Sequence, residues 1–283
     1  MLLRVDHTTT YTYDRPVRGV AQSHRLTPTR FDGQQTVEWQ VAVTDGTRGG
    51  SFRDGAGDWV EGWTVKGPVA QIEVRVSGLV QITDLSGVLR GHRELVPPEA
   101  YMRESPATAM DAALSRLAMA AQGTADALSA AHALALAVSE AVAYRPGSTH
   151  AKTTAAEALA QGEGVCQDHA QILCAVARAA DLPARYVSGY LSSGGDVAGT
   201  GAAGTGAAAT GAAQEAAHAW AELFIAGIGW IGFDPANECC PDARYLRLGS
   251  GLDAKGAAPI RGTTRGTGEE TLSVTVAVQA QAQ

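Results

Sequence analysis

The sequence has few charged residues, few cysteines and no long apolar run. Charged side chains are 18% of the 283 residues, with 22 basic and 29 acidic groups and a formal net charge of −7. This balance disfavours nucleic acid or an anionic membrane as a partner. No stretch approaches the roughly 18 consecutive apolar residues of a membrane helix, and the start, MLLRVDHTTTYTY, lacks the apolar segment of a secretory signal. We therefore expect a cytoplasmic protein.

Only four cysteines are present: Cys166, Cys174, Cys239 and Cys240. They are too few for a disulfide framework in a chain of this length, so we expect four free thiols. A zinc site would need a set such as Cys239 and Cys240 with His218, or Cys166 with His169. Adjacent cysteines are poor ligand spacing, and no Cys-x-x-Cys pair occurs. We therefore expect neither a metal nor a cofactor.

The first hundred residues predict β-strands. The segments LRVDHTTTYTYD, VEWQVAVTD, DWVEGWTV and QIEVRVSGLVQI are rich in β-forming residues, and Gly, Pro and Asp turn signals separate them. Helical periodicity is absent from this part of the sequence. We therefore expect an antiparallel β-sandwich or a similar all-β domain over residues 1–98, which ends at Pro97-Pro98.

Helical patterns begin after residue 98. Residues 106–121 and 125–143 are rich in Ala and Leu with helical spacing, and Gly123 or Thr124 is placed to start the second helix. A short helix in TTAAEALAQG, a longer one over 166–180 and a strand in ARYVSGYL follow. AHAWAELFI and GWIGFDP predict a β-hairpin, and TLSVTVAVQ predicts a last strand after a Gly-rich connection at 249–268. Residues 194–217 are nearly all Gly, Ala and Thr, which predicts a flexible surface loop.

Cys166 is the first candidate for chemistry. It follows Gly162 and Gly164 and opens the helix expected over 166–180. A cysteine at a helix N-terminus lies near unpaired backbone N–H groups and the positive end of the helix dipole, which favour the thiolate. The same N–H groups can stabilise an oxyanion. From this segment alone, a buried apolar cysteine is an equal alternative, whereas Cys174, among apolar neighbours, is expected in the core.

His218 and Asp234 are candidates for the base and its partner. His218, Trp220 and Glu222 share one face of their strand because side chains alternate. If the hairpin closes with a three-residue loop, Trp220 pairs with Asp234, and Asp234 lies diagonal to His218 on the same face; a two-residue loop would separate them. In isolation, a structural histidine and an Asp-Pro turn are the alternatives. Together with Cys166, the order is that of a Cys-His-Asp triad for acyl transfer.

Three separated segments resemble one known family. GVCQDHAQILCAVARAADLPARYVSGYL, AHAWAELFI and GWIGFDPANE resemble the bacterial branch of the transglutaminase-like superfamily, and LRVDHTTTYTYDRPV with SHRLTPTR resembles the β-rich N-terminal domain that accompanies that core in bacteria. The resemblance covers most of the chain. It implies an α+β fold with an N-terminal all-β, sandwich-like domain (1–98) and a papain-like, transglutaminase-like cysteine-enzyme core (99–283).

The resemblance also implies roles. Cys166 is expected to be the nucleophile, His218 the general base and later acid, and Asp234 the group that orients the imidazole. The implied reaction attacks an amide or ester carbonyl and passes through a thioester that water or an amine resolves. The backbone N–H groups of Cys166 and Gln167 are the expected oxyanion donors. Gln167 stands where animal transglutaminases have a tryptophan, so cross-linking activity does not carry over, and no acidic calcium loop is visible.

Four other residues have expected roles near this site. Trp220 and Tyr190 are expected at a substrate cleft, Asp168 as a structural residue at the helix N-terminus, and Arg185 as an ion-pair partner. The leading hypothesis is a cysteine amidase, a peptidase or deamidase rather than a cross-linking transglutaminase, acting on a peptide or protein amide. The alternatives are a non-catalytic binding module on the same fold and, third, a structural zinc protein.

Overall fold

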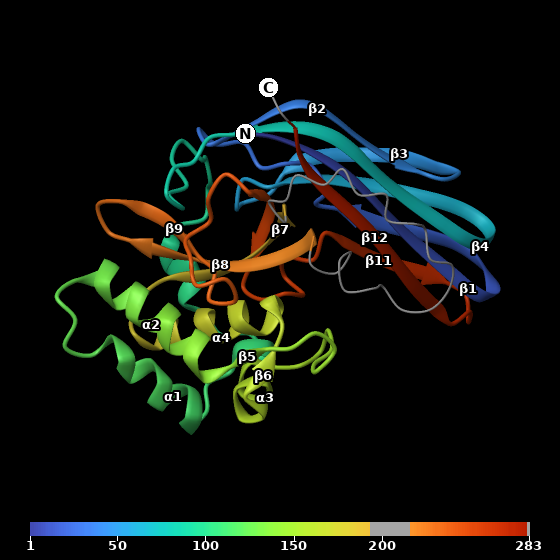
Figure 1. Cartoon of the computed structure of the whole chain (residues 1–283). Coiled ribbons are helices and arrows are strands. Elements are labelled where there is room, and N and C mark those ends of the chain that lie inside the picture. Colours follow the sequence, from blue (N-terminus) through green and yellow to red (C-terminus); the bar gives the residue numbers. More distant parts are fainter. Residues whose placement is uncertain (193–215, 282–283) are drawn as a thin grey trace.

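The alternating residues at the start of the chain form one long strand, β1 (Leu2–His24), in a six-stranded antiparallel sheet. Its odd-numbered residues from Leu3 to Tyr13 are buried, and the residues between them are more exposed. The computed structural model describes residues 1–192 and 216–281 (Figure 1). The fold is mixed α and β with a strand-rich N-terminal region, as predicted. Of the loop expected at 194–217, only Ala216 and Ala217 lie among the described residues.

The centre of the large sheet is β4 (Trp59–Ile82), which pairs with β1, β2 (Gln34–Val43) and β3 (Gly46–Arg53). The sequence predicts two strands where β4 is one. The pairing of β1 with β4 shifts its register beside Gly67 and Pro68, between the Val17–Val69 and Gly19–Lys66 pairs. A bulge at this point accommodates a proline, which has no N–H to donate to the ladder.

The last strands of the chain return to this sheet. Both β11 (Ile260–Arg265) and β12 (Glu270–Gln281) pair with β1, and Leu2 lies opposite Gln281 (Figure 1). The prediction of an irregular connection at 249–268 is therefore wrong for the residues of β11. This Gly- and Thr-rich segment has no strand signal of its own and becomes a strand because it pairs with β1. The boundary at residue 98 stays a prediction, and the part that follows it supplies two strands to the first sheet.

Among the residues that the structure describes, four α-helices lie together on one side of the molecule (Figure 1). They are α1 (Ala112–Ala118), α2 (Ala127–Ala141), α3 (Ala155–Gln161) and α4 (Cys166–Ala179), with short 3-10 turns at Pro98–Met102, Pro106–Thr108 and Met119–Ala121. The helix predicted over 106–121 starts later, because the Asp111 carboxylate caps α1 at Leu114 N. Asp126 caps α2 in the same way, instead of Gly123 or Thr124. No described helix is long and apolar enough to cross a membrane.

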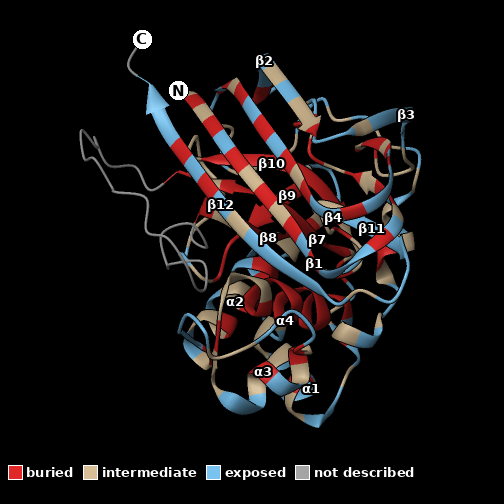
Figure 2. Ribbon diagram, turned by 90° about the vertical axis from the view of Figure 1, so that its right-hand side faces the viewer, coloured by how far each residue is buried: buried red, intermediate tan, exposed pale blue. Residues whose placement is uncertain are grey.

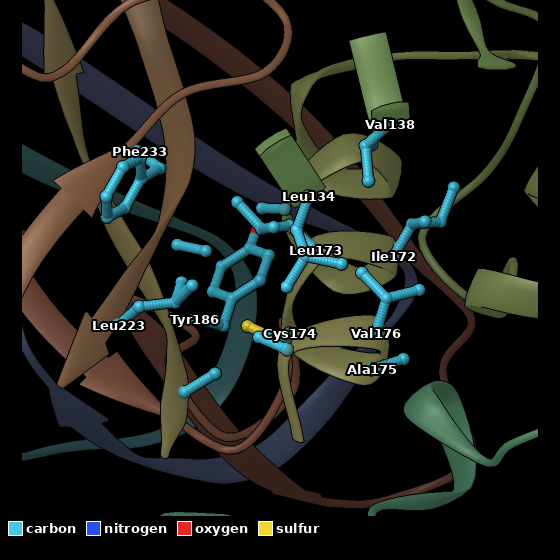
Figure 3. Close-up of a cluster of buried hydrophobic side chains, with 14 of the residues drawn as sticks. Leu134, Val138, Ile172, Leu173, Cys174, Ala175, Val176, Tyr186, Leu223 and Phe233 are labelled. Atoms are coloured by element: carbon cyan, nitrogen blue, oxygen red, sulfur yellow. The ribbon is translucent and has the colours of Figure 1, made fainter. Parts of the chain in front are cut away.

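A second, four-stranded antiparallel sheet lies between the helices and the large sheet. Its order is β10 (Tyr245–Gly251), β7 (Ala184–Leu191), β8 (Ala217–Ile225) and β9 (Gly229–Phe233). Helix α4 packs on β7 and β8 through a cluster that includes Leu173, Tyr186 and Leu223 (Figure 3). Cys174 is fully buried in this cluster, as predicted. Burial of each large apolar side chain contributes about 1.5–3 kcal/mol.

The large sheet covers the other side of the second sheet. Its inward stripe of buried residues, visible along the strands in Figure 2, packs against Tyr190, Leu246 and Leu248. The connection from β4 to the helices also joins the second sheet, because Leu89 N donates to Trp230 O (2.9 Å) and Gly232 N donates to Gly87 O (2.9 Å). These contacts fix the two sheets against each other.

A buried ionic cluster crosses the interface between the sheets. The Glu222 carboxylate accepts hydrogen bonds from Arg185 Nε (2.7 Å) and Arg247 Nε (2.8 Å). Arg247 also binds Asp58 (2.7 Å), next to the first residue of β4, and Arg185 binds Glu94. Burial alone would raise the pKa of Glu222, but the two guanidinium groups lower it to about 2. Arg185 is therefore an ion-pair partner, as predicted.

We expect Glu222→Gln to lower the free energy of unfolding at pH 7 by about 3–5 kcal/mol, because it leaves two buried arginines without their shared counter-charge. Urea denaturation measures the change. The matched control is Glu73→Gln, which removes the partner of Arg75, an arginine that is 70% exposed; we expect less than about 1 kcal/mol there. Equal stabilities of the two variants would contradict the structural role of the cluster.

The low pKa of Glu222 also gives this cluster a pH dependence. A carboxyl group with a lowered pKa in the folded state contributes stability above its unfolded pKa and loses it as the pH falls. The difference between wild type and Glu222→Gln should therefore be full above about pH 4.3 and shrink as the pH approaches about 2.

Candidate active site

The segment before Cys166 has little conformational freedom. Helix α3 ends at Gly162, whose φ of 67° is left-handed. Strand β6 (Glu163–Gly164) then pairs in parallel with β5 (Ala143–Tyr144). A Cβ on Gly164 would lie 2.8 Å from the Cβ of Asp168, so only glycine fits there. The backbone conformation of the residues before Cys166 is therefore fixed.

Cys166 is the first residue of α4 and is half-buried. Asp168 stabilises the N-terminal end of α4. Its Oδ2 accepts hydrogen bonds from Val165 N (2.8 Å) and Thr149 Oγ1 (2.6 Å). Asp168 is fully buried in this structural role. The first N–H groups of a helix have no intrahelical acceptor. Those of Cys166 and Gln167 therefore remain the expected oxyanion donors.

The hairpin of β8 and β9 brings His218 to Asp234. Its strands pair Ala221 with Phe233 and Ile225 with Gly229, so the loop has three residues, 226–228. The same register places Trp220 opposite Asp234, as the sequence argument requires for a shared face. His218 Nε2 lies 2.6 Å from Asp234 Oδ2, and both side chains are buried.

Two residues that the sequence argument missed also bind Asp234. Asn237 Nδ2 and the Tyr245 hydroxyl each donate to Oδ2 at 2.7 Å, and Ala236 N donates to Oδ1 at 3.1 Å. Asn237 lies in the segment GWIGFDPANE, three residues after Asp234, so the sequence did contain a signal that its amide could bind the carboxylate. Tyr245 had none, because its position depends on how β10 pairs with β7. The carboxylate is thus held by four donors, counting His218 Nε2.

The charges of the site reinforce one another. Burial lowers the pKa of His218, but hydrogen bonds and the charges of Asp234 and Cys166 raise it to about 10. Burial raises the pKa of Asp234, whereas the hydrogen bonds from His218, Asn237 and Tyr245 bring it below its ordinary value. Because His218 Nε2 is occupied by Asp234, Nδ1 is left for the Cys166 side chain. The fold therefore brings all three predicted residues together.

Trp220 lies against His218 and Tyr190 does not. The Trp220 indole stacks on the His218 ring at a centroid distance of 6.4 Å. The Tyr245 ring packs edge-on against the Trp220 indole at a centroid distance of 5.5 Å. Tyr190 is 1% exposed, and its hydroxyl lies 2.7 Å from His7 Nδ1. The register pairs Gly189, not Tyr190, with His218, so Tyr190 points to the opposite face. Its expected place at a substrate cleft is wrong for this reason.

The adjacent cysteines support the turn after β9. Cys239 exchanges backbone hydrogen bonds with Asp234 (2.8 and 3.2 Å), and its Sγ lies 3.3 Å from the Tyr245 hydroxyl. Among residues 1–192 and 216–281, no three His, Cys, Asp or Glu side chains are grouped as metal ligands would be.

Known proteins resemble both parts of the chain. Residues 115–235 match the model of the transglutaminase-like superfamily, and residues 3–81 match that of the bacterial transglutaminase-like N-terminal region. An uncharacterized protein of Mycobacterium leprae is 28% identical over 98% of both chains. A protein-glutamine gamma-glutamyltransferase of Pseudomonas aeruginosa is 33% identical over 32% of this chain and 12% of its own length.

One solved structure shares the fold of the whole chain. The crystal structure of "a Putative Cysteine Protease" from Cytophaga hutchinsonii superposes with a TM-score of 0.71 and 20% sequence identity, covering 100% of this chain and 92% of that one. At this identity the likeness establishes the common fold: a strand-rich N-terminal region followed by the core that carries Cys166, His218 and Asp234.

We expect Asp234→Asn to lower the pKa of His218 from about 10 by more than one unit, because a neutral amide stabilises the imidazolium less while burial still opposes it. NMR titration of the histidine ring measures the pKa. Asp242→Asn, which removes a carboxylate paired with Arg244, is the control and should leave it unchanged. An unaltered His218 titration in Asp234→Asn would rule out the carboxylate as its partner.

Proposed function

Because the chain belongs to the transglutaminase-like superfamily, we propose that it is a cysteine enzyme that transfers the acyl group of an amide through a thioester. In this proposal Cys166 is the nucleophile, His218 the base and acid, and Asp234 the group that orients and charges the imidazole. The substrate is the amide bond of a peptide or protein. One observation carries the proposal: the Cys166 thiol, at a helix N-terminus, is hydrogen-bonded to His218, which in turn pairs with the buried Asp234 carboxylate.

The proposed reaction starts from a thiolate–imidazolium pair. The Cys166 sulfur attacks the amide carbonyl carbon, and the backbone N–H groups at the start of α4 stabilise the oxyanion. The carbon–nitrogen bond then breaks. His218, which carries the proton that came from the thiol, transfers it to the leaving nitrogen, so a free amine departs and a thioester remains. Water or a second amine attacks the thioester, gives its proton to His218 and releases Cys166.

Hydrolysis is the outcome that we propose. Gln167 follows the nucleophile where animal transglutaminases have a tryptophan, and this difference weakens an inference of cross-linking activity for this chain. The Cytophaga protein named "a Putative Cysteine Protease" has the same fold, which agrees with a peptidase. The partial likeness to the Pseudomonas transferase keeps amine transfer as the second candidate. A cytoplasmic location remains part of the proposal.

We expect sub-stoichiometric iodoacetamide near pH 6 to label Cys166 in preference to the other three cysteines. Burial raises the pKa of Cys174 to about 11, and it also raises the pKa of Cys239 and of Cys240. These thiols therefore hold little thiolate at that pH, whereas His218 lies beside Cys166 as a cation. Mass spectrometry of the digested protein locates the label.

His218→Ala should abolish the preference, whereas His150→Ala, at a histidine outside the site, should keep it. The same instrument tests the chemistry: short amides should add an acyl mass to Cys166, and hydroxylamine should remove it. Equal slow labelling of all four cysteines would refute the activated nucleophile. Labelling of Cys166 without any acyl adduct would instead favour a binding module that has kept the fold.

A further inference from the structure

Tyr245 connects the two opposite edges of the second sheet. It is the first residue of β10, whereas Asp234 follows the last residue of β9, and the strand order β10-β7-β8-β9 places these strands at the two edges. The Tyr245 hydroxyl nevertheless donates to Asp234 Oδ2 at 2.7 Å. Tyr245 is 4% exposed, so this hydrogen bond forms away from water. A carboxylate that lies beyond the end of its own strand is therefore bound from the far side of the sheet.

Packing fixes the direction of the Tyr245 ring. Its centroid lies 5.5 Å from that of Trp220 and 5.7 Å from that of His218, edge-on in both cases. The Trp220 indole has room because Gly189 on β7 has no side chain: a Cβ there would lie 2.7 Å from the indole. These ring contacts hold the Tyr245 hydroxyl toward Asp234.

The protons along this chain of hydrogen bonds have one arrangement. Burial and the charge of Asp234 raise the pKa of Tyr245 far above its ordinary value, so the hydroxyl keeps its proton. That proton goes to the Asp234 carboxylate, which accepts hydrogen bonds and has none to donate. The Cys239 thiol lies 3.3 Å from the same hydroxyl and donates to its oxygen, because burial raises the pKa of Cys239 as well. A hydroxyl that accepts one hydrogen bond is a stronger donor of the next.

Three donors converge on one oxygen of Asp234. His218 Nε2 (2.6 Å), Asn237 Nδ2 (2.7 Å) and the Tyr245 hydroxyl (2.7 Å) all bind Oδ2, whereas Ala236 N binds Oδ1 at 3.1 Å. The hydrogen bond from Tyr245 therefore holds the same atom that orients His218. If Oδ2 moved, the imidazole would turn with it, and its Nδ1 would no longer point at the thiol.

We propose that Tyr245 is a positioning residue of the proposed acyl transfer and acts through Asp234. The inference rests on the proposed function and adds a fourth side chain to its machinery. The hydroxyl fixes Oδ2 and favours the ionised carboxylate. His218 then keeps the orientation in which Nδ1 takes the proton of the thiol and gives it to the leaving nitrogen. No bond within Tyr245 forms or breaks in the reaction.

The experiment compares Tyr245→Phe with Tyr190→Phe in the full chain. Each variant removes one buried hydroxyl with a 2.7 Å hydrogen bond, to Asp234 in the first case and to His7 in the second, and keeps the aromatic ring. Acylation of Cys166 by N-acetylalanine amide is followed by mass. At neutral pH we expect Tyr245→Phe to react about tenfold or more slowly, because a hydrogen bond to a charged group is lost. Tyr190→Phe should react at the wild-type rate.

The pH dependence separates positioning from a general loss of stability. Burial raises the pKa of Asp234, and the hydrogen bond from Tyr245 is one of those that bring it below its ordinary value. Tyr245→Phe should therefore raise this pKa and move the acid-side loss of activity to higher pH. NMR titration of the Asp234 carboxyl carbon measures the same change. The other titratable or charged groups around Asp234 and Tyr245 are His218 on β8, Cys166 on α4, and Cys239, Asp242 and Arg244 in the segment before β10.

A wild-type rate and midpoint in Tyr245→Phe, or an equal slowing in Tyr190→Phe, would overturn the positioning role. A wild type that forms no acyl adduct would count against the proposed function instead, and the titration of Asp234 would still decide whether Tyr245 holds the carboxylate.

A measurement on the wild type decides if Tyr245→Phe melts below Tyr190→Phe. The Cζ carbon signal of Tyr245 should move near pH 10, where His218 loses its charge beside the shared oxygen. The signal of Tyr190 should stay in place. The tyrosines themselves do not titrate there, because burial raises the pKa of both. A Tyr245 signal that does not move with His218 would refute the coupling.

Discussion

The Glu222 carboxylate, held between two buried arginines, is the contact on which the arrangement of this protein depends. It lies on β8, on the face that also carries His218 and Trp220, and Arg247 links it to Asp58 beside the large sheet. Since a buried charge requires its partners, the second sheet has one position against the first. The orientation of β8, and with it the direction of His218, follows from that position.

The site itself is a network in which the carboxylate is the most heavily bonded group. Asp234 accepts from His218, Asn237, Tyr245 and Ala236 N, so its charge is fixed in place before any substrate arrives. That charge keeps His218 protonated in a buried position where a histidine would otherwise be neutral. The protonated His218 ring in turn lies beside Cys166, where its charge can stabilise a thiolate. Such preorganisation is what the proposed acyl transfer through a thioester requires.

Local signals in the sequence predict the parts of this structure that depend on local geometry. The glycines before Cys166, the start of its helix and the two strands around residues 226–228 all follow from spacing and alternation. Long-range pairing was not visible in the same way. Tyr245 binds Asp234, and Tyr190 points away from His218, because of how β10 and β8 pair with β7. The continuity of β4 through Pro68 and the strand β11 likewise depend on β1, far away in the sequence.

The position of β1 sets the order in which the protein can fold. It lies between β4 on one side and β12 on the other, and its partners in β12 are up to 279 residues away, from Leu2 to Gln281. Contacts of such separation form late and slow the search for the native state. During synthesis, β1 and β4 can pair as soon as both have left the ribosome, but one edge of β1 must wait for the final strand. The sheet that supports the ionic cluster is therefore complete only once β12 has been made, and until then β1 keeps an unpaired edge.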